Sequence, residues 1–207
     1  MASISVLTEG YVIDLEGGRI RASPSSVLIE DGETRVLVDP GSDREGLLLG
    51  LSRKGLHPRD VEILFVTHTH LDHLLNLRLF PEADVSDSSF IYRGDEGIPA
   101  GRFIPGTEVE ILPTPGHTPD HASLLVAVEG EVVLVAGDLF WWRRGAVQRT
   151  DPESLTEMED EFASDTSALR RSRLEALERA DIVIPGHGKP FRLHRGSSSR
   201  LRRKPFL

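Results

Sequence analysis

Cysteine is absent from the 207-residue sequence, and this absence excludes two features at once. The fold cannot rely on disulfides, and no thiolate is available to bind a metal ion. No apolar run approaches the ~18 residues of a membrane-spanning helix. The N-terminus lacks a basic start followed by an apolar block, so no secretory signal is expected. We therefore expect a cytoplasmic protein without membrane contact, built as one domain on a core of two or more layers.

Positive charge is scarce over most of the chain. Residues 194–207 hold five Arg or Lys and no acid, which leaves 19 basic and 33 acidic groups on residues 1–193. A body with a net charge of −14 is a poor general binder of nucleic acid, because phosphate contacts need basic surface. A small-molecule substrate is therefore expected, and the basic tail leaves RNA open as a second partner. The composition does not indicate an oligomeric state.

Hydrophobic patterns predict strands followed by helices, in two rounds. The first forty residues read as strands separated by turns, and a helix is predicted over 43–54. A buried strand, "EILFVT", comes next, with a short helix over 73–79. Short strands and turns are predicted for 84–112, and an apolar hairpin for 121–138. Two sheets packed together with helices outside would satisfy this order.

The pattern becomes helical again from Asp151. This residue is a suitable N-cap because Pro152 and an acid follow it in the first turn. A second helix is predicted after Asp165, and the strand "DIVIP" follows it. The apolar faces of the two helices are expected to consist of Leu155, Met158 and Phe162 in the first and Leu169, Leu174 and Leu177 in the second.

Histidines and aspartates gather where predicted strands end. The stretches are "VTHTHLDH", "TPGHT", "VAGD" and "PGHG". Imidazole and carboxylate together suit zinc, iron or manganese. Since side-chain direction repeats every two residues in an extended segment, His68 and His70 should point the same way. The candidate metal ligands are His68, His70, Asp72, His73, His117, Asp138 and His187.

Each of these residues has a plainer explanation when it is taken alone. A single His117 or His187 would more often be structural, and Asp138 could be a helix N-cap. His57 and His121 are interpreted in that way. The dense cluster and the three further stretches after apolar strands instead favour a metal site.

The order of these motifs resembles the metallo-β-lactamase superfamily over residues 1–193, with 194–207 as a basic C-terminal tail. The resemblance implies a four-layer αβ/βα sandwich, in which two mixed β-sheets are flanked by helices and the site lies at one edge. It also implies two divalent metal ions, for which zinc is favoured and iron or manganese would fit. Asp39, in "VLVDPGS", would support the metal loop. The implied ligands are His68, His70 and His117 for the first metal, Asp72, His73 and His187 for the second, and Asp138 as a bridge.

Such a centre implies hydrolysis. A water held between two divalent ions loses its proton near neutral pH, and a metal polarises the substrate's carbonyl or phosphoryl oxygen. Asp72 would orient this nucleophile as well as bind metal. An ester-type bond in a thioester or other acyl small molecule is the expected substrate. The alternatives are a phosphodiesterase or endoribonuclease acting on RNA, and a non-catalytic metal-binding module.

The sequence lacks features of particular branches of the superfamily, and these differences narrow the range of relatives that it resembles. A true β-lactamase is not expected, because Asp138 occupies the bridging position and cysteine is absent. Tyr11 and Tyr92 are the only tyrosines, so the tyrosine used by the lactonase branch is missing. The chain looks most like the group of metallo-β-lactamase domain-containing protein 1 and its prokaryotic relatives. Two positions differ from the pattern, since Leu75 and Asp120 stand where glycine is usual.

The segment after Asp138 suggests a substrate pocket. Trp141 and Trp142 could form an aromatic platform, and Arg143 and Arg144 an anion clamp. The alternative is that one tryptophan belongs to the core and both arginines are solvated.

Overall fold

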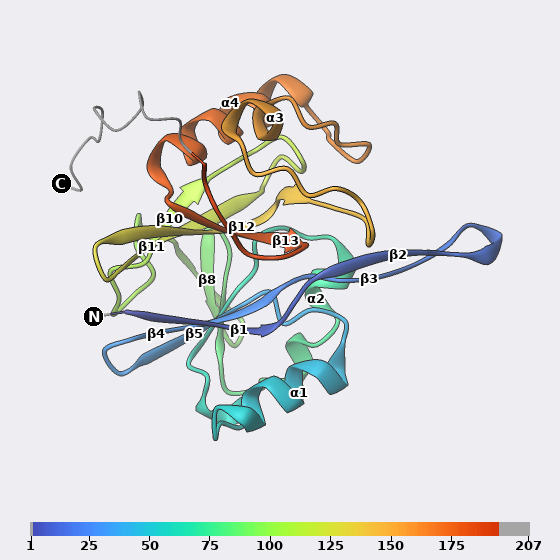
Figure 1. The fold of residues 1–207 in the computed structure, drawn as a ribbon. Coiled ribbons are helices and arrows are strands. Elements are labelled where there is room, and N and C mark those ends of the chain that lie inside the picture. The colour runs from blue at the N-terminus through green and yellow to red at the C-terminus, as the bar shows by residue number, and fades with distance from the viewer. Residues whose placement is uncertain (1, 195–207) are drawn as a thin grey trace.

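Two mixed β-sheets face each other and helices cover their outer faces (Figure 1). In the computed structural model, which describes residues 2–194, α1 (Arg44–Arg53) packs on the outer face of the first sheet. The helices α3 (Pro152–Thr156) and α4 (Thr166–Arg179) pack on the outer face of the second. This arrangement confirms the predicted four-layer sandwich. Within the described residues, no helix is both long and apolar enough to cross a membrane.

The first sheet contains seven strands within residues 2–194, in the order β1-β4-β5-β6-β7-β8-β9. Its centre, β5-β6-β7, is parallel and its other neighbours are antiparallel. The strands are β1 (Ser3–Thr8), β4 (Ser26–Asp31), β5 (Thr34–Val38), β6 (Ile63–Phe65), β7 (Asp84–Ser86), β8 (Phe90–Arg93) and β9 (Glu96–Pro99).

The second sheet contains five strands within the same residues, in the order β10-β11-β12-β13-β14, and only β12 and β13 run parallel. The main core lies between the two sheets. Alternate residues of β4, such as Val27 and Ile29, meet alternate residues of β11, such as Leu124 and Val126. The strands are β10 (Glu110–Pro113), β11 (Ala122–Val128), β12 (Glu131–Trp141), β13 (Ile182–His187) and β14 (Phe191–Arg192).

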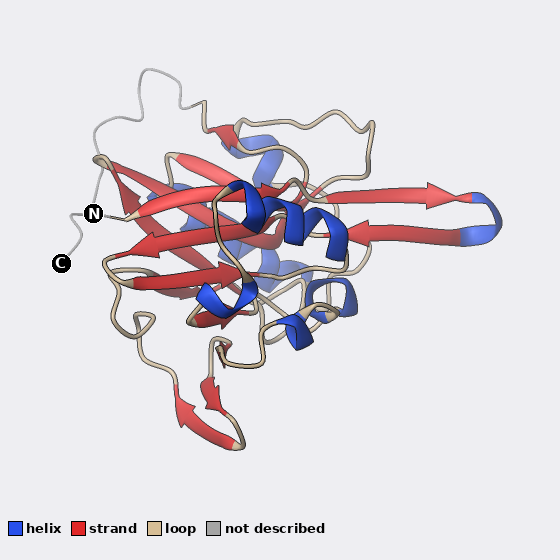
Figure 2. Cartoon of the chain, turned by 90° about the horizontal axis from the view of Figure 1, so that it is seen from below, coloured by secondary structure: helices blue, strands red, loops and turns tan. Residues whose placement is uncertain are grey.

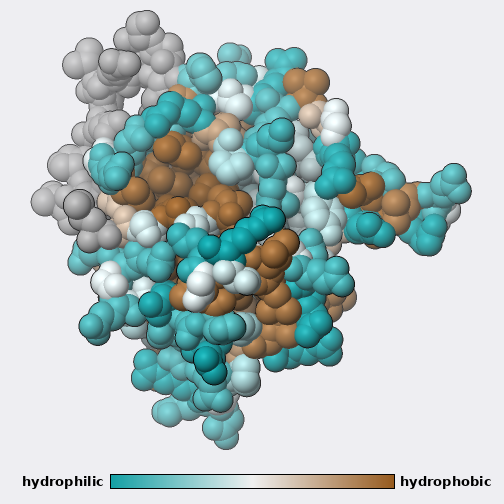
Figure 3. All heavy atoms as spheres, turned by 60° about the horizontal axis from the view of Figure 1, so that its bottom comes forward, coloured by the Kyte–Doolittle hydropathy of each residue, from teal (hydrophilic) through white to brown (hydrophobic). Residues whose placement is uncertain are grey.

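A two-stranded ribbon projects from the sandwich (Figures 1 and 2). It consists of β2 (Tyr11–Leu15) and β3 (Arg19–Ser23), joined by the short 3-10 turn η1 (Glu16–Gly18). The space-filling view shows this arm with apolar side chains among hydrophilic ones (Figure 3), and both Leu15 and Ile20 are exposed. The root of the ribbon touches β13 and the short helix α2 (Leu71–Leu74), so it lies beside the histidine-rich segments.

The helix predictions are confirmed where the cap residues are strong. Asp43 caps α1 and accepts a hydrogen bond from the Gly46 amide, and Asp165 caps α4 in the same way through Ala168. Gly55 follows α1 with φ of 73°, which stops the helix because most residues avoid this region. The hairpin over 121–138 is also present as β11 and β12.

Two helices differ from their predictions. The helix expected over 73–79 is split into α2 and η3 (Leu77–Leu79), with the Asn76 side chain donating a hydrogen bond to the Pro40 carbonyl. The helix expected to run from Asp151 to Phe162 ends at Thr156. In the irregular segment that follows, Phe162 is partly exposed instead of sharing a buried helical face. A further 3-10 turn, η2 (Pro58–Asp60), precedes β6.

Candidate metal centre

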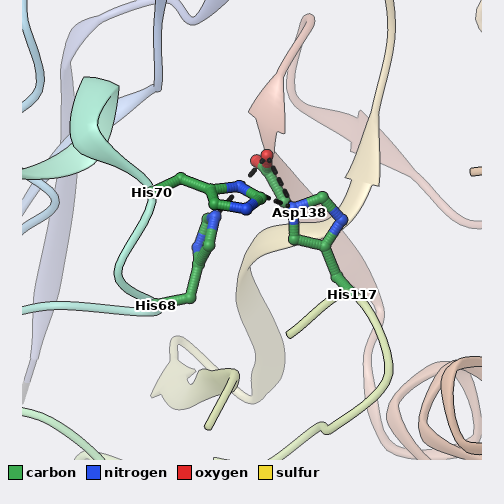
Figure 4. A group of neighbouring side chains, drawn as sticks. All are labelled: His68, His70, His117 and Asp138. Carbon is green, nitrogen blue, oxygen red and sulfur yellow. Dashed lines mark hydrogen bonds and ion pairs between the residues drawn. The ribbon is translucent and has the colours of Figure 1, made fainter. Parts of the chain in front are cut away.

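Several segments bring histidines and aspartates together at one edge of the sandwich. His68 and His70 follow β6, and His117 lies between β10 and β11 (Figure 4). Their ligand atoms and that of Asp138 lie within 4.8 Å of one another. A second group is equally tight, and it consists of Asp72, His73 and His187.

Asp138 joins the two groups because each of its carboxylate oxygens faces one of them. Its Oδ2 lies 3.5 Å from His117 Nε2 and 3.9 Å from His68 Nε2. Its Oδ1 lies 3.5 Å from both His73 Nε2 and His187 Nε2. Asp138 is not the helix cap of the plainer explanation, since it lies inside β12. Asp138 is therefore placed so that one carboxylate could serve both groups.

The glycine before His187 makes room for this carboxylate. A Cβ added at Gly186 would lie 2.0 Å from Asp138 Oδ1, closer than any real contact. At Gly137, where φ is 54°, a Cβ would lie 2.7 Å from Thr67 Oγ1. The glycines of "VAGD" and "PGHG" are therefore needed for close approach of the strands around Asp138.

Hydrogen bonds to the far side of each imidazole set its tautomer. His73 Nδ1 lies 2.9 Å from the Asp39 carboxylate and His117 Nδ1 lies 2.7 Å from that of Asp160. His187 Nδ1 donates to the Ser23 carbonyl at 3.0 Å. Because these acceptors carry no proton to donate, each Nδ1 holds a hydrogen, and Nε2 is the ring nitrogen left to face the centre.

His68 obtains the same tautomer through a hydroxyl. Thr67 Oγ1 donates to Asp39 Oδ2 at 2.8 Å and therefore accepts from His68 Nδ1 at 3.1 Å. Asp39 also accepts the Thr67 amide at 2.9 Å, so it organises the start of the histidine loop as expected of a supporting residue. Its φ of 48° is in the left-handed region, which aspartate tolerates better than most residues.

Buried atoms at the centre lack partners within the protein. His68 Nε2, His73 Nε2 and Asp138 Oδ1 are buried and make no hydrogen bond. Leaving such an atom unsatisfied costs about 1–3 kcal/mol. Cations between these atoms would satisfy all three together, and nitrogen and oxygen donors without sulfur suit zinc, iron or manganese. The residues therefore fit two divalent ions.

Charge at the centre differs between its two halves. Burial lowers the pKa of His68 well below its usual value and also lowers the pKa of His70, so both are neutral at pH 7. Burial would likewise lower the pKa of His187, but the Asp138 carboxylate outweighs it and raises that pKa to about 9. Asp138 itself stays ionised, because His187 and His73 lower its pKa against the effect of burial. This negative field favours cations, and a divalent ion would compete with protons for His187.

Asp160 is a site residue that the sequence analysis did not single out. It follows α3 in the irregular segment, and its side chain is fully buried against His117. The helix predicted for this region had Leu155, Met158 and Phe162 on its apolar face, and Asp160 was not among the residues named. The concentration of acids in "EMEDEFASD" was the available signal, but it does not tell which acid turns inward.

The four residues of the expected substrate pocket have different surroundings in the structure. Trp141 is buried, with its ring 5.5 Å from Phe162, and Trp142 packs on Phe191. Arg143 is paired with Asp14 of the ribbon and Glu161 of the irregular segment, so it is not a free anion clamp. Arg144 is exposed, and its guanidinium lies 5.2 Å from the centre of the Tyr11 ring.

Of the other residues that the sequence pointed to, three lie near the centre and one lies away from it. Leu75 is the exposed C-cap residue of α2, and Asp120 is exposed at a cavity of about 160 Å³ beside His68. His121 is buried behind the centre, where burial lowers its pKa to about 3. His57 caps η2, and the tail 195–207 lies outside the described residues.

Comparisons with known proteins agree with this architecture. The family model of the metallo-beta-lactamase superfamily matches residues 20–85 and 88–187. Metallo-beta-lactamase domain-containing protein 1 of Xenopus laevis is 38% identical over 203 residues, which cover 92% of this chain and 82% of that protein. Hydroxyacylglutathione hydrolase of Haemophilus influenzae is 26% identical, covering 79% and 84%.

A solved structure shows the same fold at low sequence identity. A Thermotoga maritima protein described as a metallo-beta-lactamase superimposes with a TM-score of 0.68 at 20% identity, covering 92% of this chain and 99% of that one. The motifs, the sandwich and the family match therefore lead to one conclusion: this chain belongs to the metallo-β-lactamase superfamily.

Proposed function

We propose that this protein is a binuclear metal-dependent hydrolase that cleaves an ester-type bond in a thioester or another acyl small molecule. The observation that carries the proposal is the placement of Asp138, which turns one carboxylate oxygen toward each group of ligand atoms. The named activity of the Haemophilus influenzae relative, hydrolysis of hydroxyacylglutathione, supports an acyl substrate. The net charge of −9 also favours a small substrate over a polyanion.

The residues that would hold the two ions fall into the two groups of neighbouring ligand atoms described above. When bound, the ions would supply Lewis acidity that polarises a substrate oxygen and lowers the pKa of water. Zinc is the favoured metal because the donors are mostly imidazole, with iron or manganese also compatible. The proposed ligands are His68, His70 and His117 for one ion, Asp72, His73 and His187 for the other, and Asp138 for both.

Asp72 is the member of this set that is placed to act on substrate. Its side chain is 27% exposed, whereas those of His73 and His187 are 0% and 3% exposed. Burial would raise its pKa, but the hydrogen bond from His187 and the nearby His73 lower it, so Asp72 is a carboxylate at neutral pH. We propose that Asp72 orients the attacking water and accepts its proton, as a general base within reach of the centre.

Apolar side chains next to Asp72 support an acyl substrate. Leu71 begins α2 and Leu75, four residues on, is its C-cap; the two are 72% and 56% exposed. Exposed leucines beside a polar centre offer a surface for an alkyl chain, because burying it against them removes apolar area from water.

A phosphodiester substrate is the second candidate, and one feature of the ribbon favours it. Arg144 stacks over Tyr11, and burial raises the pKa of the Tyr11 hydroxyl while nearby Arg21 opposes that shift. Two arginines around a partly buried aromatic ring can hold a phosphate and stack on a base. A non-catalytic metal-binding module is the third candidate, which predicts metal uptake without turnover.

One assay separates these candidates. Zinc-loaded protein is incubated with a panel of thioesters, esters and lactones and with unstructured RNA, with Asp72→Ala and the exposed Glu33→Gln variant in parallel. We expect turnover of an acyl substrate that is lost in Asp72→Ala and kept in Glu33→Gln. Acyl turnover that survives Asp72→Ala would contradict the proposed role of this carboxylate. RNA cleavage that depends on Asp72 would support the second candidate, and no turnover with bound zinc the third.

A further inference from the structure

Asp160 contacts the centre from outside the ligand set. Its Oδ2 accepts a hydrogen bond from His117 Nδ1 at 2.7 Å, and both side chains are almost fully buried. We propose that Asp160 is a positioning residue, which holds the His117 ring in its metal-binding orientation and thereby sets the affinity of the first metal site. This inference rests on the proposed two-metal centre and adds a residue that the motifs do not contain.

The Asp160 carboxylate is itself held in place. Its second oxygen, Oδ1, accepts the Phe162 amide at 3.0 Å, and the Phe162 ring packs on Trp141. These contacts direct Oδ2 toward His117. The orientation of the imidazole is therefore defined by an atom with little freedom to move.

A buried arginine anchors the segment that carries Asp160. Arg173 of α4 is 2% exposed, and its Nε donates to the Leu139 carbonyl of β12 at 3.0 Å. Its Nη1 donates to the Met158 carbonyl, just before Asp160. One guanidinium thus ties the strand that carries Asp138 to the segment that carries Asp160. Burying this charge is costly, since burial lowers the pKa of Arg173 to about 10.

The backbone around His117 is held by the residues just after Asp160. The Ser164 amide donates to the His117 carbonyl at 3.1 Å, and the Asp165 amide donates to the Gly116 carbonyl at 3.0 Å. A Cβ at Gly116 would lie 2.2 Å from the Leu169 amide nitrogen, so the ligand loop lies directly against α4. Segment 158–165 therefore holds both the main chain and the ring of His117.

The other imidazoles of the first group are held less directly. His70 Nδ1 faces His117 Nε2 at 3.1 Å, and His68 reaches a carboxylate only through Thr67. His117 is the member of this group whose ring contacts a carboxylate at its Nδ1. Removing Asp160 should consequently free His117 and weaken the first site, while the second site keeps the support of Asp39.

The test measures metal binding, which a purely structural role would not change. The stepwise dissociation constants of the two zinc equivalents are determined by chelator competition for the wild type, Asp160→Ala and Asp160→Asn. The control is Glu159→Gln, which changes the exposed acid beside Asp160. His117→Ala identifies the equivalent that belongs to the first site. Thermal unfolding with and without zinc is measured on the same samples.

We expect Asp160→Ala to weaken the equivalent that His117→Ala removes by about 10–100-fold, the usual effect of losing such a partner. Asp160→Asn, which keeps an acceptor oxygen but loses the charge, should fall between Asp160→Ala and the wild type. Glu159→Gln should match the wild type. The rise in unfolding temperature on adding zinc should shrink in Asp160→Ala.

Unchanged zinc constants in Asp160→Ala overturn the proposal. A lower unfolding temperature without zinc, combined with an unchanged rise on adding zinc, also overturns it, because Asp160 would then serve stability alone. If Asp160→Ala fails to fold, Asp160→Asn decides, and wild-type constants in that variant overturn the proposal. Failure of the proposed function is distinct, since the wild type itself would then bind fewer than two equivalents or turn over no substrate.

Discussion

Asp39 and Asp160 contact the centre in the same way from opposite halves of the molecule. Asp39 follows β5 of the first sheet and accepts from His73, whereas Asp160 precedes α4 on the second sheet and accepts from His117. Asp39 also binds the amide and hydroxyl of Thr67. The support from Asp39 is therefore built into the end of a strand, whereas the support from Asp160 depends on how α4 packs.

The largest expected effect comes from the carboxylate shared by both halves. Asp138→Ala should remove both zinc equivalents, because each of its oxygens faces one group. Loss of the Lewis acid should slow hydrolysis by about 10³-fold or more, since it contributes several kcal/mol and each 1.4 kcal/mol is tenfold. Metal content and turnover are measured in parallel with the exposed control variant Glu33→Gln. Two retained zinc ions would show that Asp138 does not join the halves.

Gly186→Ala should disturb the same carboxylate without changing a ligand. The new methyl group would lie 2.0 Å from Asp138 Oδ1, so either the carboxylate or β13 must shift. We expect reduced zinc content and a loss of about 1–3 kcal/mol in unfolding free energy, as is usual for overpacking. Gly101→Ala is the matched control, because its nearest atom is 3.9 Å away. If Gly186→Ala binds as much zinc as Gly101→Ala does, the expected clash with Asp138 would be contradicted.

Asp39→Ala should destabilise the fold more than Asp160→Ala does. Asp39 is 2% exposed and its loss leaves His73 and two groups of Thr67 without an acceptor. Removing one partner of a buried charged network costs about 3–5 kcal/mol. For a chain of this size each 1 kcal/mol lowers the unfolding temperature by about 2–4 °C. Calorimetry of both metal-free variants checks the order, and a larger loss for Asp160→Ala would reverse the comparison.

A further prediction concerns an ion pair away from the centre and gives a baseline for acid sensitivity. Glu110 of β10 is buried, and its carboxylate binds Arg179 of α4 at 2.5 Å and Arg102 at 3.4 Å. Burial would raise the pKa of Glu110, but these arginines lower it below the ordinary value of 4.5. Its contribution to stability is therefore present above pH 4.5 and is lost as the pH falls through the lower pKa of the folded state.

Glu110→Gln tests this baseline. At pH 7 the variant should lose about 1.5–3 kcal/mol of unfolding free energy, the contribution of hydrogen bonds to charged groups. The difference from the wild type should narrow as the pH falls below 4.5. Denaturant titrations at several pH values measure it, and a difference that stays constant with pH would contradict the ionic contribution.

The sequence predicted the parts of the centre that lie in regular structure or short motifs. His68 and His70 follow an apolar strand, so their common direction comes from the period of extended backbone. Asp39 was found because it follows a strand with a recognisable motif. The sandwich could be predicted because apolar runs and strong caps, such as Asp43, define its elements.

Asp160 and the paired state of Arg143 could not be predicted in this way. The apolar spacing of Leu155, Met158 and Phe162 indicates a helix, but the helix ends at Thr156. Beyond the helix end, Arg173 donates a hydrogen bond to the Met158 carbonyl, and Asp160 accepts one from the Phe162 amide. These partners are distant in the sequence or lie in irregular backbone, and local helix propensity carries no information about such contacts.

Anomalous diffraction from crystals of the zinc-loaded protein tests the two-metal centre most directly. The account predicts two zinc peaks on either side of Asp138. One should contact His68, His70 and His117, and the other Asp72, His73 and His187. A single peak, or peaks away from these side chains, would contradict it.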